Sequence, residues 1–338
     1  MGDRTRPLRW LYLKRFHLVA LGMASLLGLG LLEVAIRVLD PLGISYYEET
    51  KRYRLEKIAD PDLIFAHRPN WSTEYESVAV SFNEFGFRDD PIQPRQPDEF
   101  RILLLGDSVA FGWGVEQDEI FAARLESILS EELGRPCVVI NSGVGNYNTV
   151  QELAVLKRLG EVLAPDLLVL LYIHNDVMVH ERPFDPHAQF DLEGRDLSGK
   201  LEILLGRSWL YRLIGHVRRT RPGRAPRTQV PIAARSRGPR ESMEALGQIA
   251  GWSNEHEVPF VLYAWRHNYR PRDPLWGHLR RMGRVHGFPV EEVSPAWVPE
   301  AKYRLSAIDS HPNAAGHQLL AEGMARDLRE RGLVPQPR

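Results

Sequence analysis

The stretch Arg101–Gly114, RILLLGDSVAFGWG, is the part of this sequence that decides the fold. It opens with Ile102–Leu105, a short and wholly apolar run of the kind that a buried parallel strand shows. The run ends at the tight polar turn Gly106-Asp107-Ser108, and a helix-like segment begins soon afterwards at Asp118. Open α/β sheets place their ligands at the carboxyl ends of their strands. We therefore expect the Ser108 hydroxyl to face a crevice.

The segments after this turn alternate between strand and helix. Short apolar runs predict strands, and apolar residues every three or four positions predict helices. The predicted strands are Arg101–Leu105, Cys137–Asn141, Leu167–Ile173, Phe260–Ala264 and Val290–Val293. The predicted helices are Asp118–Leu133, Thr149–Leu159, Glu241–Glu255, Leu275–Val285 and Ala314–Arg331. Strands joined by helices imply a parallel sheet with helices on both faces, so the expected fold class is a three-layer α/β/α domain over residues 101–335.

The N-terminus has the pattern of a membrane anchor. The uncharged run Leu18–Leu32 is preceded by five cations, Arg4, Arg6, Arg9, Lys14 and Arg15. That run alone spans about 22 Å as a helix, whereas continuing to Leu39 gives about 33 Å, enough to cross a hydrocarbon core of about 30 Å. The extension contains Glu33 and Arg37, whose i,i+4 spacing lets them pair.

The positive-inside rule gives the expected topology of this anchor. Residues 1–15 are a cytoplasmic basic segment, residues 16–39 form a single-pass transmembrane signal anchor, and the chain after Asp40 lies outside the cytoplasm, in a periplasmic or extracellular space. A cleaved signal peptide is the alternative.

Residues 40–100 are broken up by prolines and are predicted to be an irregular lead-in. Within them, Ser77–Phe82 alternates like a short strand. The segment Phe82–Arg88, FNEFGFR, is rich in aromatic residues and is expected to pack under the sheet, with a substrate contact by Asn83 or Arg88 as the alternative.

Residues 181–240 are predicted to be an insertion beside the crevice. Ser198–Arg218 has the pattern of an amphipathic helix, with leucines at helical spacing. Arg218–Arg240 is crowded with arginine and proline and is predicted to be a flexible basic loop. A solvated loop is the default for that segment, and contact with anionic lipid headgroups is the alternative.

The composition limits the function classes. The hydrophobic fraction of 43%, the charged fraction of 26% and the net charge of -1 are typical of a globular protein without a nucleic-acid partner. The single cysteine, Cys137, excludes an intrachain disulfide framework and a cysteine-based zinc site. No cluster of His, Asp and Glu shows the spacing of metal ligands. GDSVAFGWG is not a phosphate-binding P-loop, because it lacks the lysine that such a loop requires. We expect no cofactor and no metal, and the sequence predicts no oligomeric state.

Four polar sites follow the predicted strands or lead into the last helix. They are Ser108, the loop Asn141–Tyr147, the tripeptide His174–Asp176 and the loop Asp309–Asn313. A serine hydroxyl becomes a nucleophile when a base takes its proton, and His311 is a suitable base near neutral pH. Asp309 lies two residues earlier and can hold the imidazole tautomer.

An acyl-transfer transition state also places negative charge on the former carbonyl oxygen, which needs preorganised donors. The candidate donors of this oxyanion hole are the N–H of Ser108, the N–H of Gly145 or Asn146, and the side-chain amide of Asn175. The sequence leaves the choice between Gly145 and Asn146 open.

These four sites together resemble the conserved blocks of the SGNH or GDSL hydrolases, which are lipase- and esterase-like enzymes on a flavodoxin-like α/β/α fold. GDSVAFG resembles the first block, which implies that Ser108 is the nucleophile. NSGVGNYNT resembles the second block, which supplies an oxyanion N–H, and HND resembles the third, which assigns the oxyanion amide to Asn175. DSHPNAAGH resembles the fifth block, whose acid and base are Asp309 and His311 here.

Three positions depart from the family pattern. Ile173 stands where glycine is usual, two residues before the third-block asparagine. The second-block glycine aligns with Gly145 in one register and with Asn146 in another. The last block is usually Asp-x-x-His, whereas this chain has Asp309-x-His311, which looks like the form in alginate-acetylation-like relatives.

The anchor and the NEFGFR segment are similar to membrane-attached bacterial members linked to cell-envelope polysaccharide or its acyl groups. The resemblance implies an esterase that hydrolyses an acetyl or short-chain acyl ester on a glycan or lipid through an acyl-serine intermediate. An O-acyltransferase using the same site and an inactive binding or scaffold module are the alternatives. An α/β-hydrolase fold is disfavoured, because Ala110 replaces the second glycine of its Gly-x-Ser-x-Gly elbow.

Overall fold

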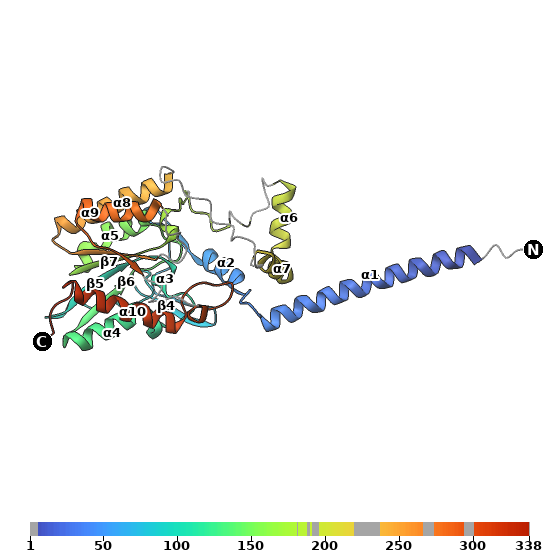
Figure 1. Cartoon of the computed structure of the whole chain (residues 1–338), viewed down its shortest axis with the longest axis horizontal. Helices are drawn as coiled ribbons and strands as arrows, with labels where there is room; N and C mark the ends of the chain where they lie inside the picture. The colour runs from blue at the N-terminus through green and yellow to red at the C-terminus, as the bar shows by residue number, and fades with distance from the viewer. Residues whose placement is uncertain are drawn as a thin grey trace, which may run out of the picture. The chain divides into compact units, whose positions relative to one another are not determined.

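The computed structural model describes residues 6–180, 182–187, 190, 196–219, 237–265, 274–293 and 301–337 (Figure 1). The chain divides into two compact units. Met1–Tyr47 and Phe190–Arg227 form the smaller unit, and Glu48–Gln189 with Thr228–Arg338 form the larger one.

The larger unit is built on a five-stranded parallel sheet with the strand order β6-β5-β7-β8-β9. Its strands are β5 (Phe100–Leu105), β6 (Cys137–Asn141), β7 (Leu167–Tyr172), β8 (Phe260–Trp265) and β9 (Val290–Val293). Every residue of β5 and β7 is buried, as expected for central strands covered on both faces.

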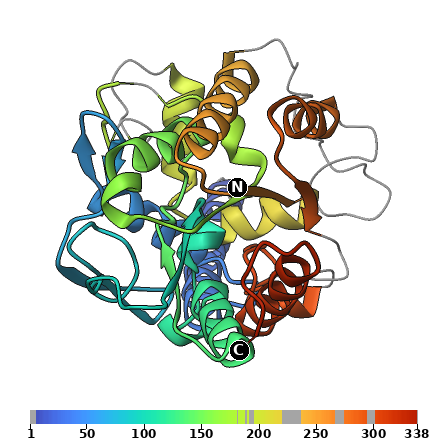
Figure 2. The same cartoon turned by 90° about the vertical axis from the view of Figure 1, so that its left-hand side faces the viewer.

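Helices cover both faces of this sheet (Figures 1 and 2). On one face, α4 (Phe121–Leu133) and α10 (Ala314–Glu330) pack in a core with Ile102 and Leu104 of β5. On the other face, α5 (Thr149–Leu163), α8 (Arg237–Glu255) and α9 (Pro274–His286) pack in a second core with Leu103 and Leu105. The predicted three-layer α/β/α fold is therefore confirmed, with every predicted strand and helix of the sheet domain in place.

The lead-in of residues 40–100 is more regular than the sequence predicted. It contains α2 (Tyr46–Glu56) and two hairpins, β1 (Ile58–Asp60) with β2 (Ile64–Ala66) and β3 (Trp71–Tyr75) with β4 (Val78–Phe82). The prediction of an irregular segment failed because its prolines fall between these elements, and strands of three to five residues are too short to show a clear period. The one predicted strand, Ser77–Phe82, corresponds to β4.

The aromatic segment before the sheet has a packing role. Asn83 accepts hydrogen bonds from the N–H groups of Phe85 and Phe87 at 3.0 and 3.1 Å and so closes a turn. Arg88 is fully buried and donates to the carbonyls of Gly112 and Val115 at 2.5 and 2.6 Å. Arg88 therefore fixes the chain that follows Ser108.

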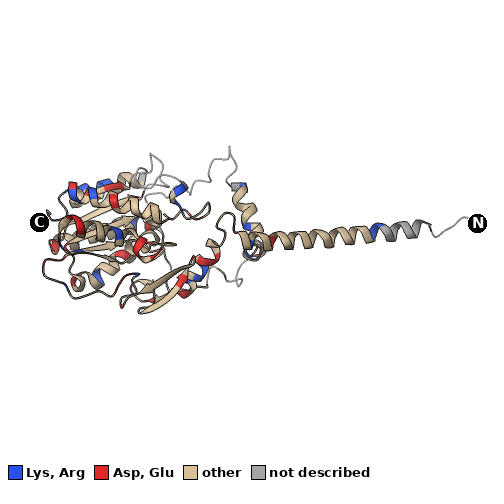
Figure 3. Cartoon of the chain, turned by 90° about the horizontal axis from the view of Figure 1, so that it is seen from below, with Lys and Arg blue, Asp and Glu red and all other residues tan. Residues whose placement is uncertain are grey.

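The smaller unit contains the N-terminal helix α1 (Arg6–Leu39), of which Lys14–Leu39 is long and apolar enough to cross a membrane. Figure 3 shows how few charged residues this helix carries. The predicted pair is formed, with Arg37 Nε 2.9 Å from Glu33 Oε1.

The predicted amphipathic helix of the insertion is two helices, α6 (Leu197–Leu205) and α7 (Trp209–Arg219). The helix is interrupted at Gly206, which caps α6, and at Ser208, whose Oγ accepts the N–H of Tyr211. A continuous leucine pattern had hidden this break. Most of the predicted basic loop, residues 220–236, lies outside the described residues.

Candidate active site

Ser108 follows the carboxyl end of β5, an inner strand of the sheet between β6 and β7, as the sequence predicted. It is the first residue of the short helix α3 (Ser108–Phe111), and Asp107 caps this helix by accepting the N–H of Val109 at 3.0 Å. A Cβ on Gly106 would lie 2.8 Å from the Cβ of Ala110, so only glycine fits where the chain turns. The sharp turn leaves the Ser108 side chain partly exposed.

The last loop brings His311 to this serine. Ser108 Oγ lies 2.8 Å from His311 Nε2, and His311 Nδ1 lies 2.5 Å from Asp309 Oδ1. The same carboxylate oxygen accepts the backbone N–H of His311 at 2.9 Å, which closes the two-residue spacing into a tight turn. The shorter Asp309-x-His311 spacing therefore still places the carboxylate on the imidazole.

Trp113 supports Asp309 from the other side. Its indole Nε1–H donates to Asp309 Oδ2 at 3.0 Å, so the two carboxylate oxygens contact different partners. Asp309 is buried, and a buried carboxylate is stabilised by such donors. Trp113 lies inside the stretch that decides the fold, but nothing in its spacing indicates this contact with Asp309.

The surroundings tune the basicity of His311. Burial by itself lowers the pKa of this imidazole, but the hydrogen bond and charge of Asp309, with the charges of Asp107 and Glu76, outweigh burial and raise the pKa above its usual value. The raised pKa makes His311 a stronger base toward the Ser108 hydroxyl.

Asn175 lies on the other side of Ser108. It belongs to the one-turn helix η2 (His174–Val177), directly after β7, and its Nδ2 donates to Asp107 Oδ2 at 2.6 Å. Ser108 Oγ lies 3.1 Å from the same oxygen of Asp107. An amide NH2 carries two hydrogens, so the Asn175 amide has one left for a further acceptor.

The turn that carries Asn175 is fixed by the neighbouring Asp176. Its carboxylate accepts the N–H of Ile173 at 2.6 Å and the hydroxyl of Thr149 at 2.8 Å. Glu152 lies beside it, and burial raises the pKa of both carboxyls, so the pair holds a proton at neutral pH. Ile173, the departure from the family glycine, is buried at the start of this turn.

The second polar loop places Gly145 and Asn146 differently. The N–H of Gly145 donates to Tyr53 Oη at 2.7 Å, and a Cβ on Gly145 would lie 2.6 Å from the Tyr53 ring. Gly145 is therefore a poor candidate for the oxyanion N–H, because this group already has a buried partner. Asn146 has a positive φ of 68°, and no hydrogen bond from its N–H to a described residue is found.

Comparison with known proteins decides the family. Residues 104–319 match the model of the GDSL-like Lipase/Acylhydrolase family. This chain belongs to that family. It is a serine hydrolase that acts on ester bonds. A search of curated proteins finds no match.

Several solved structures resemble this GDSL-like hydrolase. The lipase/acylhydrolase from Enterococcus faecalis is 16% identical over 69% of this chain and 96% of its own, with a TM-score of 0.41. The esterase EstA from Pseudoalteromonas sp. is 14% identical over 69% and 99%, with a TM-score of 0.42. A two-domain esterase active on acetylated mannans is 14% identical over 71% of this chain, with a TM-score of 0.44, and this chain spans about half (51%) of its length.

The lead-in of the GDSL-like hydrolase contributes a buried polar network behind the Gly145 loop. Tyr53 Oη accepts from Gly145 and lies 2.6 Å from His67 Nε2, and His67 Nδ1 lies 3.0 Å from the Gly86 carbonyl. Lys57 Nζ donates to the Gly145 carbonyl at 2.5 Å and lies 4.3 Å from the centre of the Tyr53 ring. The backbone N–H and the backbone carbonyl of Gly145 are thus both hydrogen-bonded to lead-in residues.

Burial sets the charge states in this network. It lowers the pKa of His67 to about 3, helped by the charge of Lys57, so His67 is neutral. A neutral His67 donates from Nδ1 to the Gly86 carbonyl and accepts the Tyr53 hydroxyl at Nε2. Burial also lowers the pKa of Lys57 well below its usual value. The sequence carried no signal for these residues, because isolated polar residues in a segment of short elements have no diagnostic spacing.

The remaining histidines near the site have other surroundings. His174 is largely buried, and burial lowers its pKa despite the nearby charge of Asp107. His317 is buried against Phe121, whose N–H it accepts at 3.1 Å, and burial lowers its pKa to about 3. His317 therefore packs in the core beside the start of α4. In the part of the chain that the structure describes, no group of three or more potential metal ligands is found.

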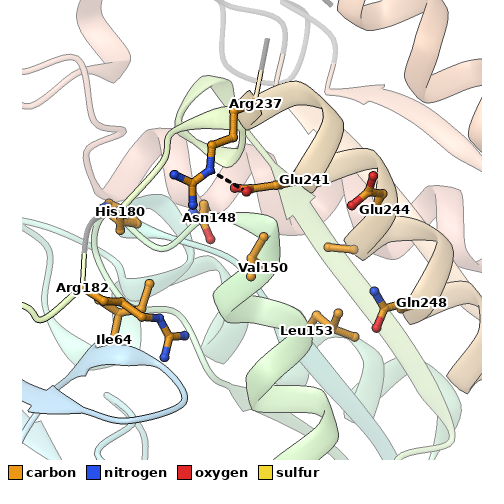
Figure 4. A pocket seen from close by; sticks show the side chains of 11 residues that line it. Ile64, Asn148, Val150, Leu153, His180, Arg182, Arg237, Glu241, Glu244 and Gln248 are labelled. Carbon is orange, nitrogen blue, oxygen red and sulfur yellow. Dashed lines mark hydrogen bonds and ion pairs between the residues drawn. The ribbon is translucent and has the colours of Figure 1, made fainter. Parts of the chain in front are cut away.

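A pocket of about 270 Å³ lies beside the Gly145 loop (Figure 4). Asn148 and His180 line it, and His180 Nε2 lies 2.8 Å from the Asn146 carbonyl. Arg237 and Glu241 lie across the pocket and are joined by an ion pair of 2.7 Å. Ser108 and His311 do not line this pocket, so it is separate from the reacting groups.

Proposed function

We propose that this protein is a membrane-anchored esterase in which Ser108 is the nucleophile and His311 the general base. Asp309 orients the imidazole and stabilises its protonated form. The proposed oxyanion donors are the N–H of Ser108, the N–H of Asn146 and the amide of Asn175. One observation carries the proposal, the chain of two hydrogen bonds that joins Ser108, His311 and Asp309. Ser108 Oγ lies 2.8 Å from His311 Nε2, and His311 Nδ1 lies 2.5 Å from Asp309 Oδ1.

The first half-reaction acylates the serine. Ser108 Oγ attacks the ester carbonyl carbon while its proton passes to His311 Nε2, and the carbonyl oxygen becomes an oxyanion. The resulting imidazolium is stabilised by Asp309, which accepts from Nδ1. When the tetrahedral intermediate collapses, the bond to the alcohol oxygen breaks, and that oxygen takes the proton from Nε2.

The second half-reaction returns the enzyme to its starting state. Water attacks the acyl carbon, gives its proton to His311 Nε2, and forms a second tetrahedral intermediate. Collapse releases the carboxylic acid and returns the proton to Ser108 Oγ. In both steps the negative charge develops between Ser108, Asn146 and Asn175, where fixed donors are most effective.

The proposed substrate is an acetyl or other short-chain acyl ester on a cell-envelope glycan or lipid. Its support is the resemblance of the anchor and the Asn83–Arg88 segment to membrane-attached members of the family, together with the apolar helix Lys14–Leu39. With residues 1–15 in the cytoplasm and 16–39 across the inner membrane, the hydrolase domain of residues 101–335 works outside the cytoplasm.

The test uses the full chain in detergent micelles or liposomes. A fluorophosphonate probe, which reacts with activated serines, should label the wild type, and short-chain nitrophenyl esters should be hydrolysed. Ser108→Ala should abolish both signals. Ser310→Ala, which alters an exposed serine next to His311, is the matched control and should keep both. Equal rates for wild type and Ser108→Ala would overturn the role proposed for Ser108.

The acyl acceptor is tested separately. Product analysis with an acetylated polysaccharide, in the presence and absence of a second unacetylated glycan, distinguishes hydrolysis from transfer. Free acetate should form at the same rate in both reactions if water is the acceptor. Acetyl groups on the second glycan would instead identify an O-acyltransferase with the same acyl-serine step.

A further inference from the structure

Helix α6 presents an apolar stripe to its surroundings. Leu197, Leu201, Leu204 and Leu205 have the spacing that places residues on one face of a helix, and their exposed fractions are 82%, 52%, 48% and 39%. A leucine stripe of this kind normally packs on another apolar surface. The described residues of this unit leave it uncovered.

Helix α7 continues this apolar surface. Ile214 and Val217 lie one turn apart and are 42% and 46% exposed. Three exposed cations accompany these helices: Lys200 in α6, Arg207 between the helices and Arg218 in α7. Leucine and isoleucine on one face with lysine and arginine beside them are the composition of helices that lie in a membrane interface.

The N-terminus of α7 is attached to α1 by Glu33. The Glu33 carboxylate accepts the hydroxyl of Ser208 at 2.8 Å and the N–H groups of Trp209 and Leu210, each at 2.9 Å. Arg37 adds a bond to the Arg207 carbonyl at 2.9 Å and lies 5.6 Å from the centre of the Trp209 ring. Glu33 thus caps α7 with a negative charge at the positive end of the helix dipole.

The position of Glu33 sets the depth of α7. Glu33 lies about 9 Å before the end of the candidate span at Leu39, given a rise of 1.5 Å per residue. Interfacial helices lie about 5–10 Å deep, at the boundary of headgroups and acyl chains. A carboxylate at this depth requires hydrogen-bond donors, and the first turn of α7 supplies them. Inserting α1 up to Leu39 therefore carries the start of α7 into the interface.

We propose that α6 and α7 lie in the interfacial layer of the bilayer that α1 crosses, on the side where the chain continues after Leu39, with the leucine stripe of α6 in contact with lipid acyl chains. This inference rests on the membrane anchoring in the proposed function. The occupant of the apolar surface is the lipid itself, and a protein partner is the outcome that the experiment must distinguish.

The experiment uses full-length protein in liposomes of phosphatidylcholine and phosphatidylglycerol. An environment-sensitive fluorophore is attached to Leu201→Cys, Leu205→Cys or Ile214→Cys, and quenching by lipids with a spin label high on the acyl chain is measured. Val285→Cys on α9, 67% exposed, is the matched control, and the wild type with its buried Cys137 gives the background. The three labels should be blue-shifted and quenched at least about three-fold more than the control.

Two outcomes would overturn the inference. Labels as water-exposed as the Val285 control would show that the stripe does not meet lipid. Blue-shifted labels that lipid does not quench would show that protein, either a second copy or another part of this chain, covers the stripe.

Variants of Glu33 test the attachment to α1. Glu33→Leu removes the cap and makes α1 more apolar, so α1 should stay inserted while quenching at position 214 falls by half or more. Glu33→Gln keeps an acceptor oxygen and should retain more of the quenching. Unchanged quenching in Glu33→Leu would contradict the depth assigned to α7.

Failure of the anchoring itself is measured separately. Carbonate extraction of the liposomes reports whether α1 is inserted, and release of the protein would overturn both this inference and the proposed anchoring. The quenching should be the same in a Ser108→Ala background, because it does not depend on catalysis.

Discussion

The two sides of the Ser108 site are held in different ways. On one side, Ser108, His311 and Asp309 contact one another, so each reacting group fixes the next. On the other side, the loop of Gly145 and Asn146 is held from behind, by side chains that contact no reacting group. Side chains in a site can thus hold one another in place by direct hydrogen bonds. The position of a backbone N–H depends instead on the residues that pack behind its loop.

The first side should be the more sensitive to a single change. Asp309→Asn keeps the shape but removes the charge that raises the pKa of His311, so kcat/KM should fall by about 10³–10⁴-fold. Without that charge the effect of burial prevails and the pKa of His311 falls. A pH–rate profile should therefore show the acidic limb, below which His311 is protonated and inactive, at lower pH than in the wild type.

Trp113→Phe is the control for this change, because it removes one donor and keeps the Asp309 charge. Its acidic limb should stay close to that of the wild type. An acidic limb that does not move in Asp309→Asn would contradict the electrostatic role of Asp309.

Asn175→Ala tests the side chain among the proposed oxyanion donors. If its amide stabilises the oxyanion, kcat should fall by about 10²–10³-fold with little change in KM. Steady-state kinetics give the split, and a melting curve checks that loss of the bond to Asp107 has not unfolded the turn. A rise in KM at constant kcat would make Asn175 a ground-state contact instead.

Tyr53→Phe tests the support behind the loop, and Tyr263→Phe on β8 is its control. The Tyr53 hydroxyl accepts the N–H of Gly145, whereas the Tyr263 hydroxyl donates to Asp327 Oδ2, and each variant removes one of these bonds. Both should lower stability by about 1–2 kcal/mol. Tyr53→Phe alone should also lower kcat, by about ten-fold, because the N–H of Gly145, the residue before Asn146, loses its hydrogen-bond partner. Equal kcat values in the two variants would remove Tyr53 from the support of the oxyanion loop.

The smallest expected effect is on stability and concerns His67, whose pKa is lowered by burial. The pKa of His67 is lowered from 6.5 to about 3 in the folded chain. Between pH 6.5 and pH 3 the histidine is therefore protonated in the unfolded chain but not in the folded chain. The stability that His67 contributes is complete above pH 6.5 and is lost as the pH falls toward 3. His67→Gln keeps an acceptor for Tyr53 and should flatten this loss.

Urea unfolding in micelles at pH 7 and pH 5 measures the effect. His187→Gln, which alters an exposed histidine, is the control for the substitution itself. A wild-type stability that is the same at both pH values would contradict the assignment of a neutral buried His67.

The sequence predicted the sheet and indicated the proposed reacting groups for the same reason. Fully apolar strands such as Leu167–Tyr172 have few alternatives, and ester chemistry demands particular residue types after them. The residues that hold the Gly145 loop from behind could not be predicted in this way. Tyr53 and Lys57 act through buried contacts with a loop about 90 residues later in the chain, and no spacing encodes such a contact. The choice between Gly145 and Asn146 likewise depended on Tyr53.

The cap that Glu33 places on α7 matters for anyone preparing this enzyme. A shortened protein that starts after the anchor would retain α6 and α7 but lose both the carboxylate and the arginine that hold them. Its leucines would then drive self-association in water. A soluble form for crystallisation should therefore omit α6 and α7 along with the anchor, because Glu33 and Arg37 of α1 hold the start of α7.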